Sequence, residues 1–225
     1  MTKKYNIIYA DPPWQFENKR TGGSMTSSAA SQYTVTSTVD LMCMDVESLA
    51  ADDCVLIMWY VGSMPKDAIL LAEAWGFEVK NINGFVWNKK TKKGLQHFGM
   101  GYYTRAGSES ALIATKGSPK VINRAVRSVI KHQVLKHSVK PDIFRQTIVE
   151  MFGDLPRLEM FARRSSPGWD LFGNEAPDSI SMPVREFSKA SAIKLILNSA
   201  KKIFSKKFID FKKPSWLKSL CDLGE

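Results

Sequence analysis

Short, mostly apolar segments alternate with segments of helical periodicity, and this alternation constrains the fold more than any other feature. Tyr5 to Ala10, Cys54 to Trp59 and Ser110 to Thr115 are short and rich in residues that favour strands. Met64 to Trp75 and Asp142 to Phe152 have helical spacing, and each is followed by a glycine. Strands that are apolar on both sides need helices on both faces of their sheet. We therefore predict a doubly wound α/β sheet.

Further elements follow from the same patterns. The expected elements are a short helix from Asp45 to Ala50, a strand from Asn83 to Trp87 and a last buried strand from Arg157 to Ala162. Residues 18–38 and 89–108 lack regular spacing and are long enough to be functional loops. Residues 185–211 have the apolar stripe of a lysine-rich amphipathic helix. We therefore expect one folded domain over residues 1–176 and a basic helical C-terminal extension over residues 177–225.

Polar residues stand where the predicted strands end. In doubly wound sheets, ligands bind outside the carboxyl ends of the strands. The residues at such ends are Asp11, Tyr60, Lys89 and Arg163. We therefore expect these side chains to share the edge of the sheet at which a ligand binds.

The positive charge of the chain is concentrated in its middle. The 225 residues have a net charge of +10, yet residues 1–88 contain 6 basic and 10 acidic side chains. Residues 89–145 contain 13 basic and 2 acidic side chains, and residues 176–225 contain 10 and 5. Charge localised in this way is typical of a surface that binds a polyanion, because Lys and Arg displace the counterions of phosphates. A solvated face that only aids solubility stays an alternative, above all for the tail.

Several classes of protein are disfavoured by the same sequence. No apolar run approaches the roughly 20 residues that span a bilayer. Because the given sequence enters a predicted strand at Tyr5, we expect no signal peptide. The scattered Cys43, Cys54 and Cys221 suit a reducing compartment rather than disulfides or a metal centre, and Cys54 lies within an apolar strand. His132 and His137 lack the spacing of metal ligands. We expect a cytoplasmic protein without a membrane partner or metal ion.

The segment Asp11-Pro12-Pro13-Trp14 directly follows a predicted buried strand, and its residue types suit the binding of a planar ring that carries an amine. The two prolines fix the backbone, so a carboxylate and one or more carbonyls are held at the open end of the sheet. These acceptors can bind both hydrogens of an exocyclic amine, and an indole ring can stack on a planar base. A proline turn with a packed tryptophan is the simpler alternative.

This segment is one of a series that resembles a known family. The series is Tyr9 to Trp14, Asp53 to Trp59, Trp75 to Phe77, Phe85 to Lys89, Glu109 to Pro119, His137 to Asp142, Leu158 to Arg164, Gly168 to Trp169 and Gly173 to Glu175. In this order it resembles the messenger-RNA-type N6-adenine methyltransferases, also called the MT-A70 family. The similarity runs from about residue 5 to residue 175. The family includes small prokaryotic and phage enzymes that act on DNA, and this chain resembles that type.

The resemblance implies a Rossmann-like methyltransferase that depends on S-adenosylmethionine, with the catalytic segment early in the chain and the cofactor-binding strand late. The catalytic residues that it implies are Asp11, Pro12, Pro13 and Trp14. The cofactor-binding residues that it implies are Ala10, Asp11, Lys140, Glu159, Arg163, Asn174 and Glu175. Asn174 and Glu175 would bind the ribose hydroxyls. Two alternatives stay open: Lys140 as an exposed lysine before a helix, and Asn174 with Glu175 as a simple turn.

The substrate that the resemblance implies is adenine in DNA, methylated at N6. A stacked base must be flipped out of the duplex before its amine can react. The candidate substrate-binding residues lie in the two long loops and are Tyr33, Lys89, Lys90, Lys92, Lys93, Tyr102, Tyr103 and Arg105. The tyrosines would stack on the base, unless they only anchor their loops, and the basic residues would contact phosphates.

We therefore predict a site-specific, adenine-specific DNA methyltransferase, active as a monomer or homodimer in the cytoplasm of a prokaryotic or phage-infected cell. One alternative keeps the enzyme and changes the substrate to adenosine in RNA. The other is a non-catalytic nucleic-acid-binding relative, which the complete tetrapeptide disfavours. The role of the basic tail stays open.

Overall fold

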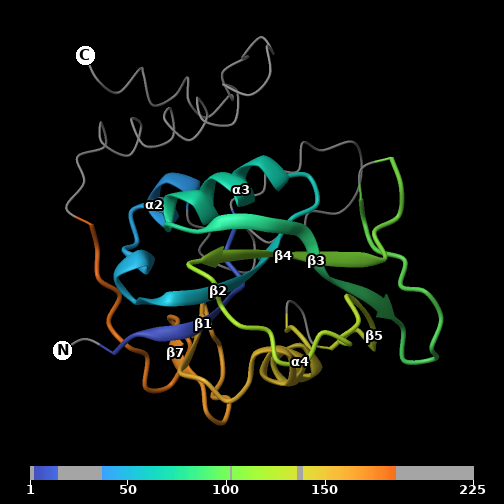
Figure 1. Cartoon of the computed structure of the whole chain (residues 1–225). Coiled ribbons are helices and arrows are strands. Elements are labelled where there is room, and N and C mark those ends of the chain that lie inside the picture. The colour runs from blue at the N-terminus through green and yellow to red at the C-terminus, as the bar shows by residue number, and fades with distance from the viewer. Residues whose placement is uncertain (1–2, 15–36, 102, 136–138, 186–225) are drawn as a thin grey trace, which may run out of the picture.

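Seven strands form one mixed sheet at the centre of the computed structural model (Figure 1). The structure describes residues 3–14, 37–101, 103–135 and 139–185. The strands are β1 (Tyr5–Ala10), β2 (Ala50–Tyr60), β3 (Glu78–Lys90), β4 (Ser108–Lys116), β5 (Val129–Gln133), β6 (Arg157–Met160) and β7 (Asp170–Phe172). Their order across the sheet is β5-β3-β4-β2-β1-β6-β7.

One strand of the sheet runs against the others. β1 is parallel to β2 and β6, β7 is parallel to β6, and β3 is parallel to β5. β4 is antiparallel to both of its neighbours, β2 and β3. The amino end of β4 therefore lies at the edge where the other six strands have their carboxyl ends, which we call the carboxyl edge.

Helices cover both faces of the sheet (Figure 1). The helices α2 (Thr38–Met42) and α3 (Pro65–Ala74) lie on one face, and α4 (Asp142–Phe152) lies on the other. Alternate residues of β1 enter two separate cores: Ile8 packs with the α2 and α3 side, and Ile7 and Tyr9 pack with the α4 side. This double burial explains why the strand segments are apolar at nearly every position. Within the described residues, no helix is long and apolar enough to cross a membrane.

The predicted doubly wound α/β fold is confirmed, and the chain has the bounds predicted for β1 and α4. The strands β2, β3 and β4 extend beyond their predicted segments, so Lys89 and Lys90 belong to β3 rather than to a loop. The predicted helix over residues 45–50 is a single 3-10 turn, Val46–Ser48, because Ala50 already begins β2. The segment over residues 157–162 was wrongly predicted as the last strand, since β7 follows it.

Other parts of the prediction were incomplete or fall outside the described residues. The elements α2, β5 and β7 were not predicted, because they are three to five residues long and the side chains of β5 alternate between exposed and partly buried. The loop over residues 18–38 lies outside the described residues except for its last two positions. The same holds for the helix over residues 185–211 except for Arg185, so the extension stays a prediction.

Phe144 of α4 is expected to be essential for stability. Its side chain is completely buried, with its ring perpendicular to Trp59 at 4.8 Å and near Phe85 at 6.1 Å. Phe144→Ala should lower the free energy of unfolding by about 3–5 kcal/mol, because it leaves a cavity between α4 and the sheet. Urea unfolding measures this change. The control is Gln146→Ala on the exposed side of α4, which should change it by less than about 0.5 kcal/mol.

Candidate active site

The Asp11-Pro12-Pro13-Trp14 segment is firmly fixed at the carboxyl edge. Asp11 directly follows β1, which lies between β2 and β6, and its backbone N–H donates to the carbonyl of Met160 at 3.4 Å. The indole N–H of Trp14 donates to the carbonyl of Trp59 at 3.0 Å, and the backbone N–H of Trp14 donates to the carbonyl of Pro12 at 2.9 Å. Trp14 is only 5% exposed, so its ring anchors the segment in the core. Its stacking on a base stays a prediction.

Asp11 is the first member of a row of four alternating charges. The ammonium group of Lys140 lies 2.7 Å from Oδ2 of Asp11 and 3.4 Å from Oε2 of Glu109. The other carboxylate oxygen of Glu109 accepts a hydrogen bond from Lys89. Glu109 reaches this position because β4 is reversed, so its second residue lies beside the last residues of β3. The row therefore joins four distant parts of the sequence along the carboxyl edge.

The charges of this row stabilise one another. Burial alone would lower the pKa of Lys140, but the carboxylates of Asp11 and Glu109 outweigh it and raise this pKa above its ordinary value. Burial would likewise raise the pKa of Glu109, yet Lys140 and Lys89 lower it to about 2. Lys140 and Glu109 are therefore both ionised at neutral pH, and Lys140 remains a fixed cation beside Asp11.

Aromatic rings and a second, buried ion pair lie next to the row. The Lys140 ammonium lies over the ring of Trp59 at 5.3 Å, and the indole N–H of Trp59 donates to the hydroxyl of Tyr9 at 2.7 Å. Arg145 lies over the ring of Tyr9 at 5.6 Å and donates two hydrogen bonds to Glu159, one to each carboxylate oxygen. Both side chains of this pair are buried. These contacts favour a structural role for Glu159, and its predicted contact with the cofactor stays a prediction.

The residues after β6 and β7 have the chemistry to hold S-adenosylmethionine. Phe161 directly follows β6 with a φ of +61°, a left-handed conformation that costs a residue other than glycine roughly 1–2 kcal/mol. Strain of this kind is often found at ligand sites. Asn174 and Glu175, which follow β7, are both exposed and can bind hydroxyl groups. Arg163 is half-buried close behind β6. The amide of Asn174, the carboxylate of Glu175 and the guanidinium of Arg163 therefore have the chemistry to bind the ribose and the carboxylate of this cofactor.

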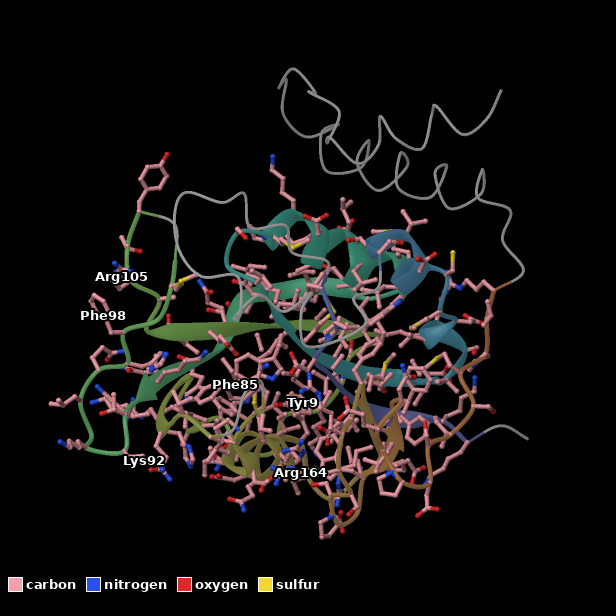
Figure 2. The ribbon with its side chains drawn as sticks, turned by 180° about the vertical axis from the view of Figure 1, so that it is seen from behind. Tyr9, Phe85, Lys92, Phe98, Arg105 and Arg164 are labelled. Atoms are coloured by element: carbon pink, nitrogen blue, oxygen red, sulfur yellow. The ribbon has the colours of Figure 1, made fainter. Side chains whose placement is uncertain are left out.

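Most of the described substrate candidates lie together on a projecting arm, which we define as residues 91–107 between β3 and β4. Figure 2 shows Lys92, Phe98 and Arg105 on this arm, away from Tyr9 and Phe85 at the centre of the molecule. The candidate residues on the arm that are exposed are Lys92, Lys93, Tyr103 and Arg105. Lys90, at the base of the arm, donates to the side chain of Gln96 at 3.0 Å.

One further described candidate, Lys89, lies off the arm. Lys89 lies against Glu109 and over the ring of Trp87 at 4.9 Å, so its contacts favour a role in the charged row rather than at phosphates. Tyr33 and Tyr102 lie outside the described residues. Their predicted stacking on a base stays a prediction. Among the described residues, no group of three or more His, Cys, Asp or Glu side chains could hold a metal ion.

Two members of the site were missed in the sequence. Glu109 was not assigned a role, although it is one of only two acidic residues among residues 89–145, and this isolation was the available signal. Arg145 was predicted to lie in a helix, but no ion-pair partner was predicted for it. It lies on the helix side that faces Glu159, where a charge would need such a partner.

Comparisons with known proteins identify the family of this chain. The model of the MT-A70 family matches residues 5–175, which include all four members of the charged row. The type II methyltransferase M.MunI of a Mycoplasma species is 36% identical over 201 residues, which cover 81% of this chain and 83% of that protein. The N(6)-adenosine-methyltransferase MT-A70-like protein of Drosophila melanogaster is 25% identical over 180 residues, 76% of this chain but 27% of that protein. The human N(6)-adenine-specific methyltransferase METTL4 is 25% identical over 187 residues, 77% of this chain and 38% of that protein.

The matched region begins with β1 and ends just after β7, so it contains the whole sheet that brings Asp11, Lys140 and Glu109 together. With a family match over this length and a relative of 36% identity over most of both chains, the chain belongs to the MT-A70 family of methyltransferases.

Proposed function

We propose that the protein transfers a methyl group to N6 of adenine in DNA, with S-adenosylmethionine as the donor. The observation that supports this most strongly is the carboxylate of Asp11, held at the carboxyl edge by Lys140 at 2.7 Å. The similarity to a type II methyltransferase favours DNA as the substrate. The basic arm beside the site favours a polyanion.

The side chains of the site suggest how each contributes. When it is bound, S-adenosylmethionine would supply an electrophilic methyl group, whose bond to the sulfonium sulfur breaks and leaves a neutral thioether. Asp11 accepts a hydrogen bond from the N6 amine of a flipped adenine, and this contact orients the nitrogen lone pair toward the methyl group. Oδ2 of Asp11 already accepts from Lys140, while no described residue donates to Oδ1. Oδ1 is therefore the atom that we assign to the amine.

Positioning supplies most of the acceleration in this proposal. Lys140 fixes the rotation of the Asp11 carboxylate, and Glu109 with Lys89 fixes Lys140. The carbonyl of Pro12 has a second lone pair that can accept from the same amine. Holding the N6 nucleophile and the methyl donor in reacting geometry lowers the barrier to methyl transfer by several kcal/mol. The proton released from N6 leaves to solvent after the transfer.

The test is a transfer assay with purified protein, S-adenosylmethionine carrying a labelled methyl group, and matched DNA and RNA strands. Digestion to nucleosides should yield labelled N6-methyladenine from DNA. A label found only in RNA would replace the proposal by the RNA alternative. Cofactor binding in calorimetry without label in either nucleic acid would overturn both, and the absence of cofactor binding would favour a non-catalytic relative.

A further inference from the structure

The arm leaves the sheet directly beside the charged row. At its base, the backbone N–H of Lys89 donates to the carbonyl of Gly107 at 2.9 Å. Lys89 is itself a member of the row, and so is Glu109, two residues beyond Gly107. A cavity of about 450 Å³ lies where the arm joins the sheet, between the arm and the strands β3, β4 and β5. A duplex that presents an adenine to Asp11 therefore lies beside an arm that stands away from the sheet.

The arm contains a two-stranded ribbon whose faces differ. Gly99 and Ala106 exchange two backbone hydrogen bonds, at 2.9 and 3.1 Å, and so form an antiparallel pair. Their face has no room for a side chain at Gly99, because a Cβ atom there would lie 2.6 Å from the carbonyl oxygen of Ala106. Since successive residues of a strand point to opposite faces, the neighbours Phe98, Met100 and Arg105 share the other face. The large side chains of the ribbon thus gather on one face.

The apolar side chains on this face are exposed. Phe98 is 73% exposed and Met100 is 66% exposed. The guanidinium of Arg105 lies 4.7 Å from the centre of the Phe98 ring, and this contact orients the ring without burying it (Figure 2). Large apolar side chains that are left uncovered side by side are typical of a binding surface. The face therefore suits a partner that can cover an aromatic ring and a thioether.

The charge of the arm favours DNA over a second copy of this chain. Residues 91–107 contain Lys92, Lys93 and Arg105 but neither Asp nor Glu. In a twofold dimer through this face, each arm would meet the same surface of the other copy, which brings like charges together. A DNA duplex instead offers phosphates to the cations and stacked bases to the apolar side chains. Two-stranded ribbons also fit into its major groove.

We propose that the arm enters a groove of the DNA duplex beside the target adenine, and that Phe98 and Met100 insert into the base stack as a wedge. Apolar side chains that insert between base pairs unstack them. The wedge fills the space that the flipped adenine leaves and so keeps the base turned toward Asp11. Lys92 and Lys93 contact the phosphates nearby. This inference rests on the proposed function, because it takes DNA as the substrate.

The test measures the rate of methyl transfer to a duplex divided by the rate to its target strand alone. Sequencing the methylated DNA of cells that express the protein first supplies the sequence of both substrates. The double variant Phe98→Ala with Met100→Ala should lower this ratio about tenfold or more, because no wedge then offsets the cost of unstacking the adenine. A mismatch opposite the adenine lowers that cost and should restore most of the ratio. The rate on the single strand corrects for any loss of folded protein.

Ile122→Ala is the matched control. Ile122 is 62% exposed, like the two wedge residues, but its backbone N–H donates to the carbonyl of Met151 near the end of α4 that lies away from the charged row. The variant removes an exposed apolar side chain far from the arm. It should therefore leave the ratio of the two rates within about twofold of the wild-type value.

The outcomes separate this inference from the proposed function. Wild-type protein that leaves no N6-methyladenine in DNA would overturn the proposed function, and the inference with it. Wild-type protein that methylates single strands but no duplex would overturn the inference alone, and so would a double variant that keeps the wild-type ratio. A double variant that turns a wild-type dimer into a monomer in sedimentation would assign the face to a second copy of the chain and overturn the wedge.

Discussion

Asp11→Ala is expected to reduce methyl transfer about a hundredfold or more, while binding of S-adenosylmethionine remains measurable. The variant removes the acceptor that we assign to the N6 amine, and oriented groups of this kind typically contribute about 100- to 1000-fold to the rate. It also leaves Lys140, which is only 9% exposed, with Glu109 as its one acidic partner among the described residues. Single-turnover rates and calorimetry on the same protein sample measure the two effects separately.

Two further variants make this result interpretable. Asp11→Asn keeps an oxygen that can accept from the amine but loses the charge that holds Lys140, so its rate should lie between those of the alanine variant and the wild type. Asp52→Ala changes an exposed aspartate near the amino end of β2, at the opposite edge, and should leave the rate unchanged. Equal rates for Asp11→Ala and Asp52→Ala would remove Asp11 from the mechanism.

The part of the site around Asp11 could be predicted because local chemistry determines it. Residues 5–10 are buried on both faces, which requires an apolar strand in the middle of a sheet. The two prolines that follow cannot continue the ladder, so the strand ends at Ala10 and Asp11 lies at the carboxyl edge. The helix over residues 142–152 was predictable for a similar reason, since its buried side has a clear helical period.

Glu109 could not be placed in the same way. The residues of β4 show that the segment is a strand, but nothing in them fixes its direction relative to β2 and β3. The rule that ligands lie beyond the carboxyl ends of strands does not select a residue at the amino end of a strand. Only the reversal of β4 brings Glu109 to Lys140. That reversal depends on the pairing of the whole sheet.

The arm was missed for a different reason. Its order comes from side chain to backbone bonds, such as those of Gln96, and from a few irregularly spaced backbone bonds, such as those between Gly99 and Ala106. Neither leaves a periodic pattern in the sequence. Its basic residues were recognised as a polyanion surface from their charge, and its tyrosines as candidates for stacking on a base, whereas the cavity where the arm joins the sheet exists only because three strands and the arm meet there.

Glu159→Gln is expected to lower the free energy of unfolding by about 3 kcal/mol. The side chains of Glu159 and Arg145 are 9% and 7% exposed, and both carboxylate oxygens of Glu159 accept from Arg145. Neutralising one partner leaves the other charge buried with too few contacts, which typically costs about 3–5 kcal/mol. The remaining bond from Arg145 to Asp142 places the expected loss at the lower end. Urea unfolding measures it.

Asp142 provides the matched control for this loss. It bonds to Arg145 at 2.8 Å and to Arg164 at 2.7 Å, but its own side chain is 54% exposed. Exposed pairs are screened by water, so Asp142→Asn should cost less than about 1 kcal/mol. A loss for Glu159→Gln as small as that for Asp142→Asn would show that the buried pair does not stabilise the fold.

A double variant decides whether Glu159 also binds the cofactor, as the resemblance implies. Arg145→Met combined with Glu159→Leu replaces the pair by apolar side chains of similar volume, and such replacements are often neutral or stabilising. We expect the double variant to regain most of the stability lost by Glu159→Gln and to bind S-adenosylmethionine within about threefold of the wild-type affinity, because both oxygens of Glu159 are already used by Arg145. A stable double variant with a hundredfold weaker affinity, about 2.7 kcal/mol, would instead place Glu159 in contact with the cofactor.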